Sequence, residues 1–139
     1  MSKIVIIGAG AMGSAFALPC LDNNHDINIV GTHLENDFID DLKKNDNLHS
    51  GLKTKIPKEI NIFKFEKFDE LLKSNVDLIV LGISSKGIEW VSDQICRLYK
   101  DNKPPKLLML TKGLSIYKNQ YELLVDKLKR HLSWSLIHI

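Results

Sequence analysis

The sequence predicts an α/β protein with a doubly wound, mostly parallel sheet and helices on both faces. Short apolar runs alternate along the chain with longer amphipathic segments, which is typical of repeated strand–helix units. Right-handed crossovers between parallel strands leave few other topologies. A chain of 139 residues predicts one domain, residues 1–139, with a core that needs no disulfides.

The strands are predicted from apolar runs. The runs KIVII and DINIV are β-branched and unbroken, as in strands buried on both faces, and VDLIVLGI is a third run of this kind. INIFKF alternates apolar and polar residues, and KLLML follows the helix-stopping segment NKPP. Strands are therefore expected at 3–7, 26–30, 60–65, 76–83 and 106–110.

The helices are predicted from apolar residues three and four positions apart. Phe38, Ile39 and Leu42 have this spacing, and Pro19 is expected to bend the first helix. Helices are expected at 11–23, 35–45, 66–74, 86–99 and 119–132. The polar segment 46–59 is expected to be a loop, and SWSLIHI (133–139) a terminal edge strand.

Composition excludes several classes of function. The chain has 19 Lys and Arg against 17 Asp and Glu, a balance that does not indicate nucleic-acid binding. Cys20 and Cys96 stand alone, which favours reduced thiols and no metal site. No apolar run approaches the roughly 20 residues of a membrane span, and no signal peptide is visible. The expectation is a cytoplasmic protein without a membrane span.

The spacing Gly8-x-Gly10-x-x-Gly13 follows a strand and begins a helix, which is the context of a Rossmann dinucleotide-binding loop. The first glycine permits the turn, the second lets the backbone approach a pyrophosphate, and the third packs the helix on the strand. Free N–H groups at the helix start would bind the phosphates. The residues expected to contact the cofactor here are Gly8, Ala9, Gly10, Ala11, Met12 and Gly13.

The end of the second strand bears on which dinucleotide is bound. An acidic residue there takes the ribose 2′-hydroxyl, whereas a basic or small polar residue tolerates a 2′-phosphate. Thr32 and His33 follow this strand, and Glu35 is the first carboxylate. Thr32 and His33 are expected to contact the cofactor, and both NAD and NADP remain open.

Three further segments extend the pattern of the glycine loop. They are HSGLKTKIPKEI (49–60), VDLIVLGISSKGI (76–88) and LLMLTKGLS (107–115), which places TKGL just past a buried strand. With GAGAMGSAFALP, this order resembles the N-terminal domain of NAD(P)-dependent glycerol-3-phosphate dehydrogenase over nearly the whole chain. TKGL is the most specific of these segments. Ketopantoate reductases also begin with GAGAMG, and a non-catalytic dinucleotide-binding module is a further alternative.

The resemblance implies roles for particular residues. Lys112 of TKGL would lie beside the nicotinamide and contact the substrate as a catalytic residue, because an ammonium can stabilise charge that develops on a ketone oxygen. Gly82, Ile83 and Ser84 would line the cofactor through backbone groups. The substrate pair implied is dihydroxyacetone phosphate and glycerol 3-phosphate.

The resemblance also implies a helical second domain, beginning at a Gly-Pro turn after the last strand. That domain would supply another lysine, an aspartate and an arginine that grips the substrate phosphate. We therefore expect these 139 residues to turn over substrate barely or not at all when alone. We also expect the chain to associate, either as a homo-oligomer or with a C-terminal domain, through the apolar residues Trp134, Leu136 and Ile137.

Overall fold

A computed structural model describes residues 1–136. Contacts within the chain group these residues into two compact units. The first unit comprises residues 1–82 and 105–110, and the second comprises residues 83–104 and the described residues from 111 onward. Each unit is described separately below.

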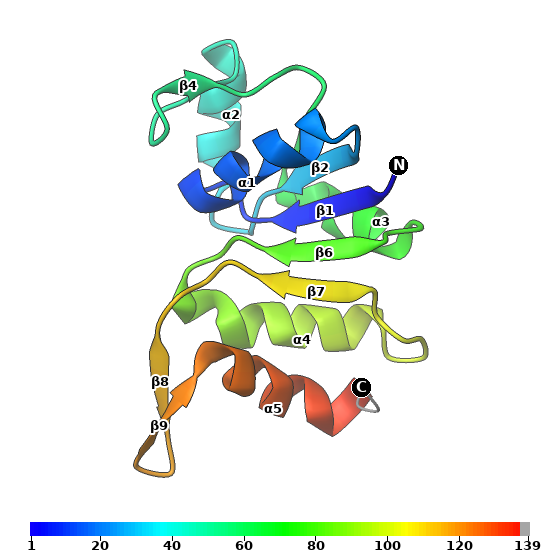
Figure 1. Cartoon of the computed structure of the whole chain (residues 1–139), viewed down its shortest axis with the longest axis vertical. Helices are drawn as coiled ribbons and strands as arrows, with labels where there is room; N and C mark the ends of the chain where they lie inside the picture. The colour runs from blue at the N-terminus through cyan, green and yellow to red at the C-terminus, as the bar shows by residue number, and fades with distance from the viewer. Residues whose placement is uncertain (137–139) are drawn as a thin grey trace. The chain divides into compact units, whose positions relative to one another are not determined.

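The first unit is built on a five-stranded sheet in the order β5-β2-β1-β6-β7, of which Figure 1 labels β2, β1, β6 and β7. All four neighbouring pairs are parallel. The strands are β1 (Lys3–Ile7), β2 (Asp26–Val30), β5 (Asn61–Phe63), β6 (Leu78–Leu81) and β7 (Lys106–Met109). The chain begins in the middle of the sheet, extends it to one edge and then returns to build the other. This order is that of a doubly wound Rossmann-like fold, the class predicted from the sequence.

Both faces of the central strands are buried, which explains their unbroken apolar sequences. Ile4 and Ile6 of β1 belong to one core cluster with Val80 of β6, whereas Val5 and Ile7 are buried at the alternate positions. Successive side chains of a strand point to opposite faces. The runs KIVII and LIVL therefore supply apolar side chains to two faces at once.

The helices of the first unit are α1 (Ala11–Asp22), α2 (Asn36–Lys44) and α3 (Phe68–Lys73), the last preceded by a 3₁₀ turn at Phe65–Lys67. Ala17 of α1 packs into the same core cluster as Ile39 and Leu42 of α2, so both helices cover one face of the sheet. The segment predicted as a loop contains a short antiparallel hairpin, β3 (Leu48–His49) and β4 (Thr54–Lys55). That hairpin was missed because its strands have two residues each.

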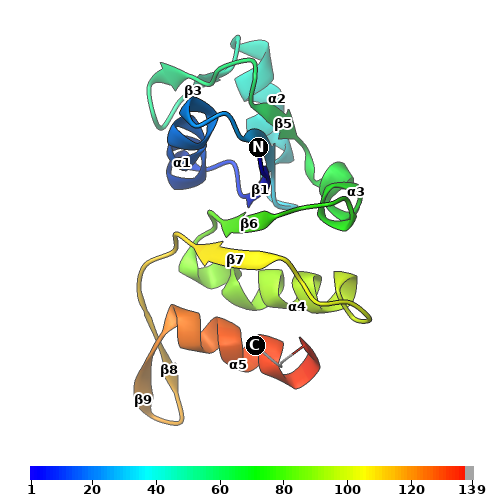
Figure 2. The same cartoon turned by 45° about the vertical axis from the view of Figure 1, so that its right-hand side comes forward.

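The second unit pairs two helices. A 3₁₀ turn (Ser85–Gly87) leads into α4 (Ile88–Leu98), which lies beside α5 (Leu124–Leu136) in both views (Figures 1 and 2). The Nζ atom of Lys127 in α5 lies 2.7 Å from Oε1 of Glu89 in α4. A hairpin of β8 (Leu114–Tyr117) and β9 (Gln120–Leu123) precedes α5.

Two predictions for the C-terminal region were wrong. The helix expected at 119–132 begins at Leu124, because residues 114–123 form the β8–β9 hairpin. The turn of this hairpin uses Lys118 and Asn119, both with positive φ (51° and 62°). The expected edge strand at 133–139 is helical as far as Leu136, and Ile137 lies outside the described residues.

Within residues 1–136, no helix has both the length and the apolar character needed to cross a membrane.

Candidate functional site

The glycine-rich loop follows the carboxyl end of β1 and leads directly into α1. Gly8 has a φ of +105°, a conformation that side-chain-bearing residues rarely adopt. Its N–H group donates a 2.8 Å hydrogen bond to the carbonyl of Val30, the last residue of β2. Gly8 is therefore required by the backbone turn that carries the chain from the sheet to the helix.

Gly13 is a glycine for a different reason, which is packing. A Cβ atom at Gly13 would lie 2.8 Å from the carbonyl oxygen of Gly8 and 3.1 Å from a methyl group of Ile6. A Cβ atom at Gly82, just past β6, would lie 2.9 Å from Cα of Gly13. Gly13 and Gly82 thus let the first turn of α1 approach the ends of β1 and β6.

Neither reason applies to Gly10. Its φ of −69° and ψ of 177° are open to any residue. A Cβ atom there would meet nothing within 4 Å in the described part of the chain. Neither the backbone conformation nor the packing therefore requires a glycine at position 10. The open space beside Gly10 would let a ligand approach the backbone of the loop closely.

The start of α1 is suited to an anion. The first N–H groups of a helix have no partner within it, and they carry the positive end of the helix dipole. In the described structure no side chain caps α1 at Gly10, and the first turn contains no acidic residue. Ala11 and Met12 are exposed, so the backbone of this turn is accessible. A pyrophosphate is an anion that such a helix start can bind.

The peptide groups of Ala9 are held by three side chains from other parts of the first unit. The Ala9 N–H donates to both carboxylate oxygens of Glu35, at 3.2 Å each. The Ala9 carbonyl accepts from Nε2 of His49 at 2.9 Å and from Oγ of Ser14 at 3.3 Å. These hydrogen bonds hold both peptide groups of Ala9 against Glu35, His49 and Ser14.

The ring of buried His49 has a defined tautomer. Its Nδ1 atom accepts hydrogen bonds from the N–H groups of Gly51 and Leu52, each at 3.2 Å, so the proton is on Nε2. The sequence analysis did not single out His49, because its partner Ala9 lies 40 residues earlier in the chain. The hydrogen bonds of Glu35 to Ala9 were also not predicted, although this carboxylate had been noted.

The loop after β2 carries Thr32 and His33, which the sequence predicts to contact the cofactor. The Thr32 N–H donates to Oε2 of Glu35 at 2.7 Å, and the Thr32 carbonyl accepts from the Glu35 N–H at 3.1 Å. His33 is exposed, and its ring lies edge-on to that of Phe65 with the centroids 6.0 Å apart. The structure thus brings Thr32 and the glycine loop together through one carboxylate.

The remaining predicted residues belong to the second unit. The Thr111 hydroxyl donates a 2.7 Å hydrogen bond to the carbonyl of Ile83, which joins the loop after β6 to the loop that contains Lys112. Ser84 is exposed and precedes the 3₁₀ turn. Lys112 is exposed, and Gly113 has a φ of +133°, which favours glycine at that position.

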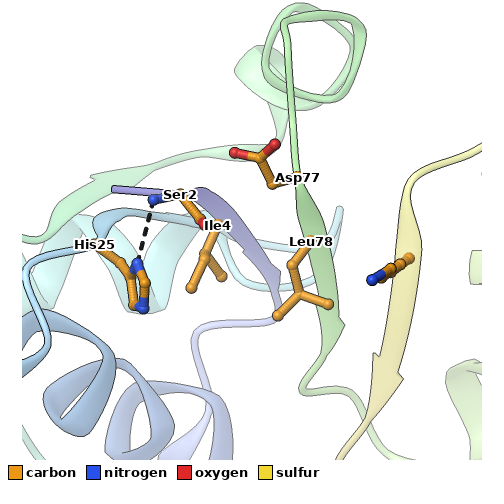
Figure 3. Close-up of a pocket in the computed structure, with 6 residues that line it drawn as sticks. Ser2, Ile4, His25, Asp77 and Leu78 are labelled. Carbon is orange, nitrogen blue, oxygen red and sulfur yellow. Dashed lines mark hydrogen bonds between the residues drawn. The ribbon is translucent and has the colours of Figure 1, made fainter.

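Cys20 and a cavity of the first unit lie apart from the glycine loop. Burial raises the pKa of the Cys20 thiol, which disfavours the reactive thiolate. A cavity of about 390 Å³ lies at the amino ends of the strands (Figure 3). In Figure 3, Ser2 donates a hydrogen bond to the His25 ring there, at 3.2 Å. Ligands of open parallel sheets bind at the carboxyl ends of the strands, so the glycine loop is the stronger candidate.

Comparison with known proteins identifies the family. The profile described as NAD-dependent glycerol-3-phosphate dehydrogenase N-terminus matches residues 3–138. The chain belongs to this family. The match favours the glycerol-3-phosphate dehydrogenases over the ketopantoate reductases, the other enzyme family considered from the sequence.

Individual relatives agree with this assignment. The chain is 30% identical, over 116 residues, to the NADP(+)-dependent glycerol-3-phosphate dehydrogenase of Archaeoglobus fulgidus, with 84% of this chain and 33% of the relative covered. A solved glycerol-3-phosphate dehydrogenase from Coxiella burnetii has the same fold, with a TM-score of 0.74 at 20% identity, and 94% of this chain and 38% of that chain are covered. The chain thus spans about a third of the length of the curated relatives it matches.

Proposed function

We propose that this chain binds NAD or NADP through its glycine loop and serves as the cofactor-binding part of a glycerol-3-phosphate dehydrogenase. The enzyme would interconvert sn-glycerol 3-phosphate and dihydroxyacetone phosphate. The observation that carries the proposal is the open space beside Gly10, next to an uncapped helix start. A dinucleotide pyrophosphate is an anion, which suits the helix start, and it needs a loop whose backbone it can approach closely.

In this proposal each part of the site has its own task. Gly8, Gly10 and Gly13 shape the loop, and the N–H groups of Ala11 and Met12 bind the pyrophosphate. Ala9 keeps the loop fixed through its bonds to Glu35 and His49. Thr32 and His33 contact the adenosine end of the cofactor. Backbone groups of Gly82, Ile83 and Ser84 line the rest of it.

When bound, the cofactor supplies or accepts the hydride. Lys112 is the catalytic residue that we assign to this chain. Reduction of a ketone develops negative charge on the carbonyl oxygen, and an ammonium group nearby stabilises or protonates it. Lys112 is exposed and lies three residues after the end of β7. The next residue, Gly113, has a positive φ. The proposal places the ammonium group of Lys112 at the carbonyl oxygen of the substrate.

The cellular setting that we propose follows from the same reaction. Glycerol 3-phosphate is a precursor of glycerophospholipids, and the dinucleotide cofactors are abundant in the cytoplasm. We therefore assign the protein to the cytoplasm and to lipid-precursor synthesis. Its partners would be the small-molecule substrate and either a second copy of the chain or a C-terminal domain.

Titration of residues 1–139 with NADH and with NADPH, followed by calorimetry, tests the proposal. We expect saturable one-to-one binding of at least one of the two nucleotides. NMN, which lacks the pyrophosphate and the adenosine, is the matched control and should bind far more weakly. A flat titration with both dinucleotides, on a chain that unfolds cooperatively on heating, would contradict the proposal.

A further inference from the structure

The carboxylate of Glu35 lies against the glycine loop rather than on its own helix. Glu35 immediately precedes α2, where a polar side chain commonly caps the first N–H groups of the helix. In the described structure the Glu35 side chain makes no such cap. Both of its oxygens instead accept from Ala9, and Oε2 also accepts from Thr32 at 2.7 Å.

The residues around Glu35 keep its side chain in this position. Gly31 marks the end of β2, and a Cβ atom there would lie 2.4 Å from Cδ1 of Ile39 and 3.4 Å from Cβ of Glu35. A larger residue at 31 would push these side chains aside. Two backbone N–H groups and a glycine therefore hold the carboxylate between the end of β2 and the glycine loop.

The carboxylate retains capacity for a ligand. An ionised carboxylate accepts about four hydrogen bonds in all. The described bonds use Oε2 twice and Oε1 once. Glu35 is half-buried, so a hydroxyl group that approaches the loop can still reach Oε1.

The charge near this carboxylate disfavours a phosphate. The segment 31–36, GTHLEN, contains no lysine or arginine, and the ring of its one histidine, His33, lies edge-on to Phe65. Lys64, which lies close to α2, is engaged by Asp40 with an Nζ–Oδ1 distance of 3.3 Å. In dinucleotide-binding folds a carboxylate at the end of the second strand accepts from the ribose 2′-hydroxyl, whereas a 2′-phosphate requires a cation.

We infer that Glu35 is the residue that binds the adenosine ribose and that this chain prefers NAD(H) to NADP(H). The inference rests on the proposed function, because it concerns the same cofactor site. It also sets the chain apart from the Archaeoglobus fulgidus relative, which is named as NADP(+)-dependent. The specificity determinant comes from the residue before α2, five positions after the last residue of β2, rather than from the strand end itself.

The test is a comparison of dissociation constants for NADH and NADPH in three forms of the 139-residue chain. The forms are the wild type, Glu35→Gln and Asp37→Asn. Glu35→Gln removes the charge and keeps the size of the side chain. Asp37→Asn removes an exposed charge two residues further along, in the first turn of the same helix, and serves as the control. Thermal unfolding shows that each form is folded.

We expect the wild type and Asp37→Asn to bind NADH at least about tenfold more tightly than NADPH, because like charges at a binding site oppose association. In Glu35→Gln this ratio should fall toward one, mainly because NADPH binding improves. Equal or tighter binding of NADPH by the wild type would overturn the inference and leave the proposed function intact. An unchanged ratio in Glu35→Gln would overturn it as well. If neither nucleotide binds the folded wild type, the proposed function itself fails. The wild-type ratio tests the inference even if Glu35→Gln does not fold.

Discussion

The three glycines of the loop meet three different physical requirements. Gly8 adopts a positive φ, and Gly13 gives space to a neighbouring carbonyl group. Gly10 meets neither requirement within the described structure: its φ is −69°, and a Cβ atom there would meet only open space. A glycine that neither conformation nor packing explains is most simply explained by a molecule that binds beside it.

This difference predicts that substitutions at Gly13 and Gly10 lower stability by different amounts. Gly13→Ala should lower the free energy of unfolding by about 1–3 kcal/mol, because its Cβ atom is forced against the Gly8 carbonyl oxygen. Gly10→Ala, at a position that precedes a helix, should lower it by less than about 1 kcal/mol. Urea denaturation of the two variants measures both values. Equal destabilisation would mean that Gly10 is also a packing glycine.

In the first unit, the small β3–β4 hairpin is hydrogen-bonded to the glycine loop. His49 of β3 donates to the Ala9 carbonyl and accepts from two N–H groups of its own hairpin. Its ring also lies edge-on to Phe38 of α2, with the centroids 5.1 Å apart. One buried ring therefore connects the hairpin, α2 and the loop.

His49→Phe keeps an aromatic ring and removes both nitrogens. It should lower the free energy of unfolding by about 1–3 kcal/mol, since buried polar groups lose their partners. It should also weaken NADH binding, because the loop is held less firmly. His25→Phe is the control: it removes one hydrogen bond at the amino edge of the sheet and should leave NADH affinity unchanged. The role of the hairpin would be refuted by equal NADH affinity in both variants.

In the second unit, a polar cluster joins the β8–β9 hairpin to α5. Glu122 accepts from Nη2 of Arg130 at 2.6 Å and from the hydroxyl of Ser115 at 2.8 Å. The guanidinium of Arg130 lies over the Tyr117 ring, 3.8 Å from its centroid. The hydrogen bond from Arg130, supported by that from Ser115, holds the pKa of Glu122 below its ordinary value of 4.5.

A lowered pKa in the folded state means that Glu122 contributes stability above its unfolded pKa and loses it as the pH falls. Glu122→Gln should therefore have a lower Tm than the wild type at pH 7. The difference should shrink as the pH falls below about 4.5, because the unfolded chain then binds a proton at Glu122 that the folded carboxylate does not yet accept. It should be smallest once the folded carboxylate is protonated as well. Thermal unfolding between pH 3 and pH 7 follows this difference. A gap in Tm that is independent of pH would show that charge at Glu122 plays no part.

At the scale of the whole molecule, much of the fold could be predicted because the signals are local. The central strands are unbroken apolar runs, and the glycine loop combines its spacing with a strand before it and a helix after it. The β8–β9 hairpin was missed because its turn residues, Lys118 and Asn119, adopt positive φ without a glycine. Leu124, Leu128 and Leu132 have the spacing of a helix, so the predicted helix was extended back over β9.

The site was predicted less completely than the fold. The glycines and Thr32 could be proposed as cofactor contacts because they follow strand ends, and these contacts stay predictions. The contacts of Glu35 and His49 with Ala9 could not be predicted, because they join residues 26 and 40 positions apart. No local pattern encodes such side-chain contacts, which depend on how the helices and the hairpin pack.

The proposed division of the reaction between this chain and a C-terminal domain predicts weak catalysis by residues 1–139. Positioning the reacting groups can supply roughly 7–11 kcal/mol of the barrier, and a single exposed lysine cannot also orient the substrate. NADH oxidation with dihydroxyacetone phosphate should therefore stay near background in the wild type and in Lys112→Ala. Rapid turnover that depends on Lys112 would show that this chain holds the complete site.

The central claim is that the glycine loop is built to receive a dinucleotide at Gly10. Calorimetric titration with NADH of the wild type and of Gly10→Val tests it most directly, with thermal unfolding as the check that both are folded. The wild type should show saturable binding. Gly10→Val should fold and show none, because its side chain fills the space that the pyrophosphate requires. Equal affinity for NADH in the two proteins would contradict the claim.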